Sequence, residues 1–373
     1  MQIDFHYAVT YVAARFAGFS PKDAKIICYS SQYVDAAINS GVVHFRNKAM
    51  YSRISSAHTM LDYRNFQELA NHQVWIPFHF LPGNGGSKPG TDPSRKFIDK
   101  LVCKPDSYVA KDMVESCIAS YARPYGLHRL GITMHVLADT FAHQGFAGIN
   151  HEINDVANSE DLDKKPTDLR GKLVRYFGSL YSNAANKVIS NALPLGHGPA
   201  LTFPDMPFLK WSYEDGAGKM IPRDNTKIFM DAVVCIHEAM VRYQKQDPNY
   251  TLSAGDSIPM DELKKIKKNF LAFKDDDGDN RNDKWLSYIN RGKFTFTEPS
   301  EPKVKVEKFI AKGPGSWKHK ALDTTKEWEA GHERFQFTPE FLVSDWKLFH
   351  DALQIHRIDV IRNILPKYGI CAA

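Results

Sequence analysis

Three residues that can bind a metal ion follow one another at a strict four-residue interval. The stretch 135–143 carries a histidine at each end and Asp139 in the middle. On an α-helix, positions i, i+4 and i+8 lie within an arc of roughly 80°. The spacing predicts a helix here, with His135, Asp139 and His143 on one face. A carboxylate in the middle position can bridge two cations while each imidazole holds one of them.

A second pair of residues repeats this interval a short distance along the chain. His151 and Asp155 are again four residues apart, and on a helix they would add an imidazole and a carboxylate on one face. Histidines on helices often only cap, pack or face solvent, and for a single pair that alternative stays open. Two such pairs joined by His143 favour a metal centre whose nitrogen and oxygen ligands leave room for water.

Helical periodicity dominates the rest of the chain. Helix starts and apolar spacing predict helices near 4–17, 21–38, 106–121, 126–145, 170–192, 225–244, 260–273 and 338–364. The predicted fold is all-α, a multi-helix bundle with long loops. Because the character of the sequence changes after Pro248, we expect a helical metal-binding core over 1–250. Residues 251–373 are expected to form a mixed, mostly helical C-terminal appendage packed on that core.

Composition limits the classes of protein that fit this chain. Hydrophobic residues make up 43% and charged residues 24% of the 373 residues, and the net charge of +5 is small. Lysine and arginine are dispersed, so no stable nucleic-acid complex is expected. Five cysteines without a Cys-x-x-Cys pair argue against a disulfide scaffold. We find neither a transmembrane segment nor a leader, which predicts a cytoplasmic protein or one exported without a cleaved signal peptide.

Residues of the first two predicted helices can reach the same centre. His6 lies in the first helix and Asp35 late in the second. Antiparallel packing through a short loop would bring the start of one helix near the end of the other. A further ligand is expected from one of four later histidines, and the sequence ranks them only weakly in favour of His58. The four are His44, His58, His72 and His79.

His128 is a candidate for a catalytic role. It precedes His135 by seven residues and therefore lies on the same helical face, two turns away. It could be a ligand, a hydrogen-bond donor to a ligand or a substrate contact. The predicted catalytic residues are Asp139 and His128. The predicted metal ligands are His6, Asp35, His58, His135, Asp139, His143, His151 and Asp155.

The order of these residues resembles that of the trinuclear zinc superfamily, which comprises the zinc-dependent phospholipases C and the single-strand-specific zinc nucleases. The phrase 135–139, His-Val-Leu-Ala-Asp, looks like that superfamily's His-aromatic-Leu-Gly-Asp. The resemblance implies an all-α protein that hydrolyses phosphodiesters with two or three zinc ions. The phrases 1–6 and 128–135 also resemble an uncharacterised bacterial family of unknown function. The resemblance covers about residues 1–245.

Two departures from the superfamily concern the metal ligands. In the superfamily, six residues lie between the bridging Asp and the next His. In this chain, His143 follows Asp139 by only four positions. In the superfamily the amine of an N-terminal tryptophan binds zinc, whereas residue 1 here is Met1. The amine of Met1 could take the same role.

The sequence thus predicts a zinc-dependent hydrolase of phosphoric esters, phospholipase C-like or nuclease-like, in which metal-bound water attacks phosphorus. Its substrate would be a phosphate ester, with phospholipid among the candidates. Two alternatives stay open. One is a metal phosphohydrolase of the HD type, whose His-Asp pair occurs only at His350-Asp351. The other is a non-catalytic protein in which the metal is structural.

A second metal site is considered in the acidic stretch 275–283. Its acids stand at positions 1, 3, 5 and 9 of a loop similar to an EF-hand, and calcium prefers such clustered oxygens. Position 6 is Asn280 and position 12 is Leu286, where an EF-hand has Gly and Glu. The alternative is an acidic turn that caps a helix near Asp283. The candidate calcium ligands are Asp275, Asp277, Asp279 and Asp283.

Overall fold

The computed structural model describes most of the 373-residue chain. The described residues are 1–58, 67–93, 96–162, 196, 200, 202–296, 304–328 and 331–373. The helix predicted at 170–192 lies outside them. The other helices predicted from the sequence are confirmed, with ends that shift by a few residues, except at 338–364, where a 3₁₀ turn over 339–343 precedes an α-helix that begins at Asp345.

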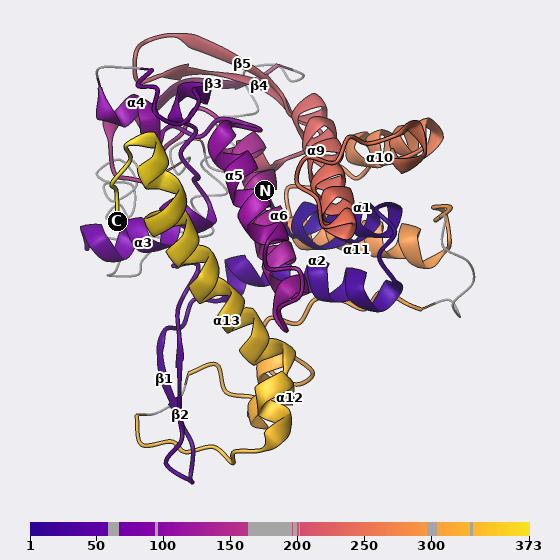
Figure 1. Ribbon diagram of the computed structural model, residues 1–373. Helices are drawn as coiled ribbons and strands as arrows, with labels where there is room; N and C mark the ends of the chain where they lie inside the picture. Colours follow the sequence, from indigo (N-terminus) through magenta and orange to yellow (C-terminus); the bar gives the residue numbers. More distant parts are fainter. Residues whose placement is uncertain are drawn as a thin grey trace, which may run out of the picture.

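Helix α6 (Gly126–Ala142) is the central element of the fold (Figure 1). It packs against α2 (Pro21–Ala36), α9 (Asn225–Lys245) and α13 (Asp345–Ile358). Almost every residue of α6 is buried, because neighbouring helices cover it on several sides. At Gly131 an added Cβ would come within 2.3 Å of the Ile27 carbonyl oxygen, so only glycine permits this close approach of α2.

The N-terminal elements lie beside α6. A π-helix, η1 (Asp4–Val9), continues directly into α1 (Thr10–Phe16), and both are buried throughout. Helix α2 then begins as the sequence predicts. The Ser20 side chain accepts a hydrogen bond from the Asp23 backbone N–H, and Pro21 occupies the first helical position. Helices α1 and α2 pack on each other, and η1 also contacts α2 and α6.

Two antiparallel sheets show that the all-α prediction is wrong. Strands β1 (Gly41–His44) and β2 (Met50–Arg53) form a hairpin. Strands β3 (Val156–Asp161), β4 (Lys210–Asp215) and β5 (Met220–Asp224) form a three-stranded sheet in that order. The protein is a mixed α and β protein. The strands could not be predicted from sequence periodicity, because they are short and several lack a clean alternation of buried and exposed residues.

The C-terminal third joins the main hydrophobic core. It contains α10 (Met260–Ala272), α11 (Gly278–Asn290), α12 (Trp317–Leu322) and α13, followed by η9 (Asp359–Ile364) and η10 (Leu365–Tyr368). Helix α11 packs on η1 and α13 packs on α6. The largest core cluster therefore includes Phe5 together with Trp285 and Tyr368. Residues 251–373 thus pack against the N-terminal elements and share a core with them.

The remaining elements are short. They are α3 (Glu68–Phe78), η3 (Asn84–Gly86), α4 (Phe97–Leu101), α5 (Tyr108–Ile118), η4 (Glu152–Asn154), η6 (Phe203–Asp205), η7 (Ala254–Asp256) and η8 (Pro339–Val343). Within the described chain, no helix has the length and apolar character that a membrane crossing needs.

Candidate metal centre

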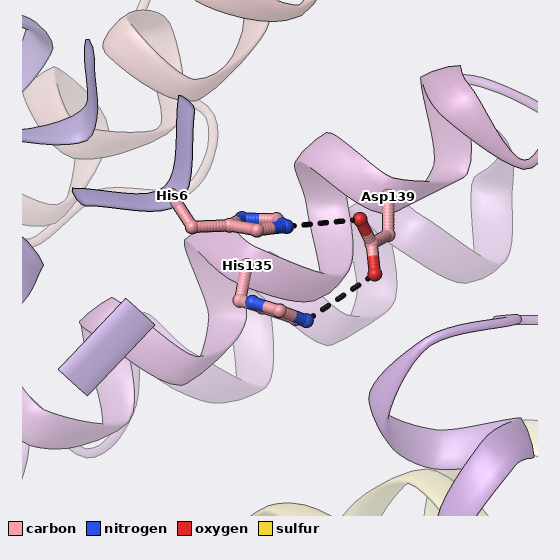
Figure 2. Close-up of side chains that lie close together, drawn as sticks. All are labelled: His6, His135 and Asp139. Carbon is pink, nitrogen blue, oxygen red and sulfur yellow. Dashed lines mark ion pairs between the residues drawn. The ribbon is translucent and has the colours of Figure 1, made fainter. Parts of the chain in front are cut away.

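Asp139 lies at the centre of a buried group of histidines. Its side chain is 1% exposed and projects from α6. Figure 2 shows two imidazoles facing its two carboxylate oxygens. His6 Nε2 lies 3.2 Å from Oδ1, and His135 Nε2 lies 3.2 Å from Oδ2. The carboxylate therefore presents one oxygen to each of two separate sets of donor atoms.

The first set of donors surrounds Oδ2 of Asp139. His135 Nε2 and His79 Nδ1 lie 3.2 Å and 3.4 Å from this oxygen, and 3.2 Å from each other. Asp35 Oδ1 completes the set, 3.7 Å from His135 Nε2 and 3.8 Å from His79 Nδ1. Ligands at about 2.0–2.1 Å from a tetrahedral zinc ion lie roughly 3.3 Å apart. The four donors therefore have spacings that suit one metal ion.

The second set of donors surrounds Oδ1 of Asp139. The α-amino group of Met1 lies 2.6 Å from this oxygen and 3.3 Å from Asp205 Oδ1. His6 Nε2 approaches the same Oδ1 from η1. Although it lies at 3.2 Å, neither ring nitrogen of His6 has a hydrogen-bond partner in the described chain. A fully buried imidazole without a partner is costly, and a bound cation would satisfy it.

Backbone carbonyls fix which ring nitrogen carries the lone pair in two histidines. Nε2 of His79 lies 2.8 Å from the Ser56 carbonyl oxygen and donates to it, which leaves the lone pair on Nδ1. Nδ1 of His143 donates to the His79 carbonyl oxygen at 2.8 Å. The lone pair of the His143 ring is then on Nε2, which lies 3.8 Å from Asp205 Oδ1. His143 therefore lies between the two carboxylates, with Nε2 towards Asp205 and Nδ1 3.7 Å from Oδ2 of Asp139.

The protonation states of the imidazoles and of Asp139 suit metal binding, whereas the Met1 amine is protonated. Burial lowers the pKa of His6 and of His135 to about 4, so both imidazoles are neutral near pH 7. Burial by itself would raise the pKa of Asp139, but His143, the Met1 amine and His135 hold it well below its usual range. The Asp139 and Asp205 carboxylates outweigh burial at the Met1 amine and raise its pKa to about 11. That amine must lose a proton before it can bind a metal.

The first turn of the chain is held in place by a buried arginine. Arg281 of α11 is fully buried, and its Nε and Nη2 bind the Asp4 carboxylate at 2.7 Å and 3.1 Å. Its Nη2 also donates to Gln2 Oε1 at 2.6 Å. The residues on either side of Met1 and His6 are therefore clamped to α11. The π-helical turn η1, a rare form that is frequent at functional sites, presents His6 towards α6.

Several predicted site residues lie elsewhere. His128 is buried on α6, but its Nε2 lies 3.0 Å from Asp345 Oδ1 of α13. His151 and Asp155 do not share a helical face, because residues 152–154 form a single 3₁₀ turn. His151 caps that turn through Nδ1, and Asp155 is exposed. Among the described residues, neither His151 nor Asp155 belongs to a group of side chains that lie close enough together to hold a metal ion. The buried His58 does not belong to such a group either.

The acidic stretch 275–283 does not form the loop that an EF-hand requires. Helix α11 begins at Gly278, and Asp277 caps it by accepting from the Asp279 backbone N–H at 2.8 Å. Asp279 and Asp283 are therefore helical residues. This arrangement supports the capping interpretation, with the helix starting five residues earlier than expected.

Two residues at the centre were not singled out by the sequence. His79 was one of four candidate histidines, among which His58 was favoured, and it follows the end of α3 in an apolar run that carries no ligand spacing. Asp205 lies in η6, within a Gly/Pro/aromatic segment without periodicity. Both reach the centre only through the tertiary fold. The one signal for Asp205 in the sequence is that this acidic residue lies in a segment whose composition is typical of the rim of a cleft.

Comparisons with known proteins identify a family but no characterised relative. No curated protein and no solved structure matches the chain. One family model matches residues 1–364, so the family extends through the C-terminal third, further than the sequence resemblance indicated. The expectation of an uncharacterised family is confirmed: the chain belongs to the family of unknown function DUF6765.

Proposed function

We propose that this protein is a zinc-dependent hydrolase of phosphoric esters with two metal ions bridged by Asp139. The observation that carries the proposal is that the two oxygens of this one carboxylate face two different sets of nitrogen and oxygen donors. Such donors suit zinc, and paired metals bridged by a carboxylate are a recurring arrangement in enzymes that cleave phosphate esters.

The chain offers enough donors for each ion. One ion would be held by Asp35, His79, His135 and Oδ2 of Asp139. The other would be held by His6, the Met1 amine, Oδ1 of Asp139 and Asp205. Bound zinc would lower the pKa of a water molecule and neutralise charge that develops on the phosphoryl oxygens. The protein residues keep the imidazoles neutral and oriented and keep Asp139 ionised.

Access to solvent supports a catalytic role over a structural one. A structural zinc site is closed to water, whereas a catalytic zinc site must be open to it. Here the Asp35 side chain is 35% exposed, and Asp35 and Met1 both line a cavity of about 970 Å³. An ester could reach the centre through this cavity.

The HD-type alternative finds less support. His350 is buried on α13 next to Trp346, and Asp351 is bound by Tyr51 and Lys347. Within the described chain, neither residue belongs to a group of side chains that lie close enough together to hold a metal ion.

The test is a panel of esters assayed with and without a chelator. The panel contains p-nitrophenyl phosphorylcholine, p-nitrophenyl methyl phosphate, single-stranded DNA and p-nitrophenyl acetate. We expect phosphodiester cleavage that a chelator abolishes and zinc restores. Cleavage that survives metal removal, or cleavage of the acetate alone, would contradict the proposal.

A further inference from the structure

Two buried polar residues stand where strand β5 leads into helix α9 (Figure 1). Arg223 is the last residue but one of β5 and is 5% exposed, and Asn225 begins α9 and is fully buried. Burying such side chains is costly unless their donors and acceptors find partners. The partners that both residues find lie in the segments that carry Asp205 and His143.

Asn225 holds the turn that presents Asp205. Its Nδ2 donates to the carbonyl oxygens of Phe203 at 2.6 Å and Met206 at 2.8 Å, which lie on either side of Asp205. The indole N–H of Trp211 donates to Asn225 Oδ1 at 3.1 Å. Because an indole N–H can only donate, this contact fixes which end of the amide faces the turn. Asn225 therefore holds the backbone both before and after Asp205.

The residue after Asn225 adds a third contact to the same turn. Thr226 Oγ1 donates to the Pro207 carbonyl oxygen at 2.8 Å, and this hydrogen bond is buried. The first turn of α9 thus binds the carbonyl oxygens of residues 203, 206 and 207. The Asp205 carboxylate is thereby held where its Oδ1 lies 3.3 Å from the Met1 amine.

Arg223 holds the C-terminal end of α6. Its Nη1 donates to the Gln144 carbonyl oxygen at 3.0 Å, and its Nη2 donates to those of Ala142 at 2.7 Å and Phe141 at 3.4 Å. These carbonyl oxygens belong to the turn that contains His143, at the end of the helix. The negative end of the helix dipole also favours a cation at this position. Arg223 therefore fixes the turn that presents His143.

The donors on the Oδ2 side of Asp139 depend on other parts of the fold. Asp35 projects from α2 and His135 from α6. His79 follows α3, and its Nε2 donates to the Ser56 carbonyl oxygen. Support for the Oδ1 side from the junction of β5 and α9 is therefore separable from support for the Oδ2 side.

We infer that Arg223 and Asn225 are positioning residues for the metal ion on the Oδ1 side of Asp139. The inference rests on the two-metal centre of the proposed function and deepens it, because it predicts that one ion can be loosened without the other. Both residues act through backbone carbonyls of the segments that carry Asp205 and His143. Replacing a residue that orients metal ligands typically costs roughly 10–100-fold in metal affinity.

Zinc affinity, measured by competition with a chelating dye, tests the inference without any hydrolysis. We expect the parent chain to bind two ions tightly. Asn225→Ala should keep one of them and bind the other at least about tenfold more weakly. Arg223→Met should do the same. Arg223→Lys should restore part of the affinity, because lysine keeps a charge and N–H donors at the end of α6.

A matched variant controls for the loss of a bracketing amide. Asn290 of α11 also uses both ends of its amide, accepting from the Val306 N–H at 2.8 Å and donating to the Val306 carbonyl oxygen at 2.9 Å. Asn290→Ala should bind both ions as the parent does. The inference is overturned if Asn225→Ala weakens both ions equally or neither, or if Asn290→Ala also loosens one ion.

A second substitution shows which ion is loosened. Asp35→Asn removes a donor of the Oδ2 side and should weaken the other ion. Asp35→Asn/Asn225→Ala should then hold neither ion as tightly as the parent. If this double variant still holds one ion at parental affinity, both substitutions act on the same ion and the inference fails.

A milder variant covers the case in which circular dichroism shows that Asn225→Ala does not fold. Thr226→Val removes only the hydrogen bond to the Pro207 carbonyl oxygen. It should weaken the same single ion to a smaller extent. Equal affinities in Thr226→Val and the parent would then overturn the inference.

Zinc affinity and ester cleavage separate this inference from the proposed function. If the parent chain binds two ions but cleaves no phosphodiester, the proposed hydrolysis fails, and the zinc affinities of the variants still decide the inference. If the parent chain binds fewer than two ions, the two-metal centre and the inference fail together.

Discussion

The charge on Asp139 decides what the centre can hold. It is almost fully buried, yet four imidazoles and the Met1 amine lie within 3.8 Å of its oxygens, and His143, the Met1 amine and His135 hold its pKa well below the usual range. An amide in its place could offer only one weak oxygen donor and no negative charge. The single substitution therefore removes the group that both sets of donors share.

Asp139→Asn should lose bound zinc and lower phosphodiester cleavage at least about 100-fold, while the helical core remains folded. Zinc content, cleavage rate and far-ultraviolet circular dichroism are measured together. His128→Gln is the matched control, because His128 lies on the same helix but faces Asp345. It should keep its zinc. Full zinc content in Asp139→Asn would show that Asp139 is not a ligand.

Local spacing explains which site residues could be predicted from the sequence. His135, Asp139 and His143 share a helix, so the geometry of one element predicts their common face. His6 and Asp35 were predicted from two helices that are joined by a short loop and pack on each other. His79 and Asp205 come from segments without periodicity, and only the tertiary fold brings them in. The common helical face predicted for His151 and Asp155 is not formed, because residues 152–154 make a single 3₁₀ turn.

At the scale of elements, α11 holds η1 against the centre. The contact depends on Arg281, whose side chain binds Asp4, Gln2 and the Asp275 carbonyl oxygen in a fully buried position. A buried ion pair is costly to break from one side, because the remaining charge has no partner. The C-terminal third therefore contributes to the order of the N-terminal turn.

Arg281→Met should lower the free energy of unfolding by about 3–5 kcal/mol, because Asp4 is left buried and unpaired. Urea unfolding in chelator measures this without a contribution from bound metal. Adding Asp4→Asn should restore part of the loss, since the double variant buries no unpaired carboxylate. The expected loss of zinc in Arg281→Met comes from a looser η1. Unchanged stability and zinc content would show that the contacts of Arg281 do not hold η1 against the metal centre.

Most helices could be predicted from the sequence, whereas the strands could not. Helix starts such as Ser20-Pro21 carry their own capping chemistry, which is local. Strand β3 instead contains mainly small and polar residues, Val-Ala-Asn-Ser-Glu-Asp, and its pairing with β4 depends on a segment more than forty residues away. The acidic stretch was ambiguous because clustered carboxylates serve equally as calcium ligands or as a helix cap.

At the scale of the whole molecule, buried neutral histidines make stability depend on pH. Burial lowers the pKa of His237 to about 4 and that of His356 to about 3. In the unfolded chain both would titrate near 6.5. Between these values the unfolded state binds more protons, so the stability that these residues confer is complete above about pH 6.5 and is lost as the pH falls.

The metal-free chain should therefore be less stable at pH 5 than at pH 7.5, by about 2 kcal/mol for each of these two histidines. Urea unfolding in chelator at the two pH values measures the difference. His356→Phe is the matched variant, because it retains a ring against Phe78 and removes one titrating group. Its pH dependence should be weaker. The same dependence in both chains would contradict the assignment.

The central claim, two metal ions bridged by Asp139, is tested most directly by the metal content of the parent chain. Protein purified without chelator, incubated with zinc and freed of excess ion is analysed by inductively coupled plasma mass spectrometry. The account predicts two tightly bound zinc ions per chain, one for each carboxylate oxygen. A chain that retains one zinc ion or none would contradict it.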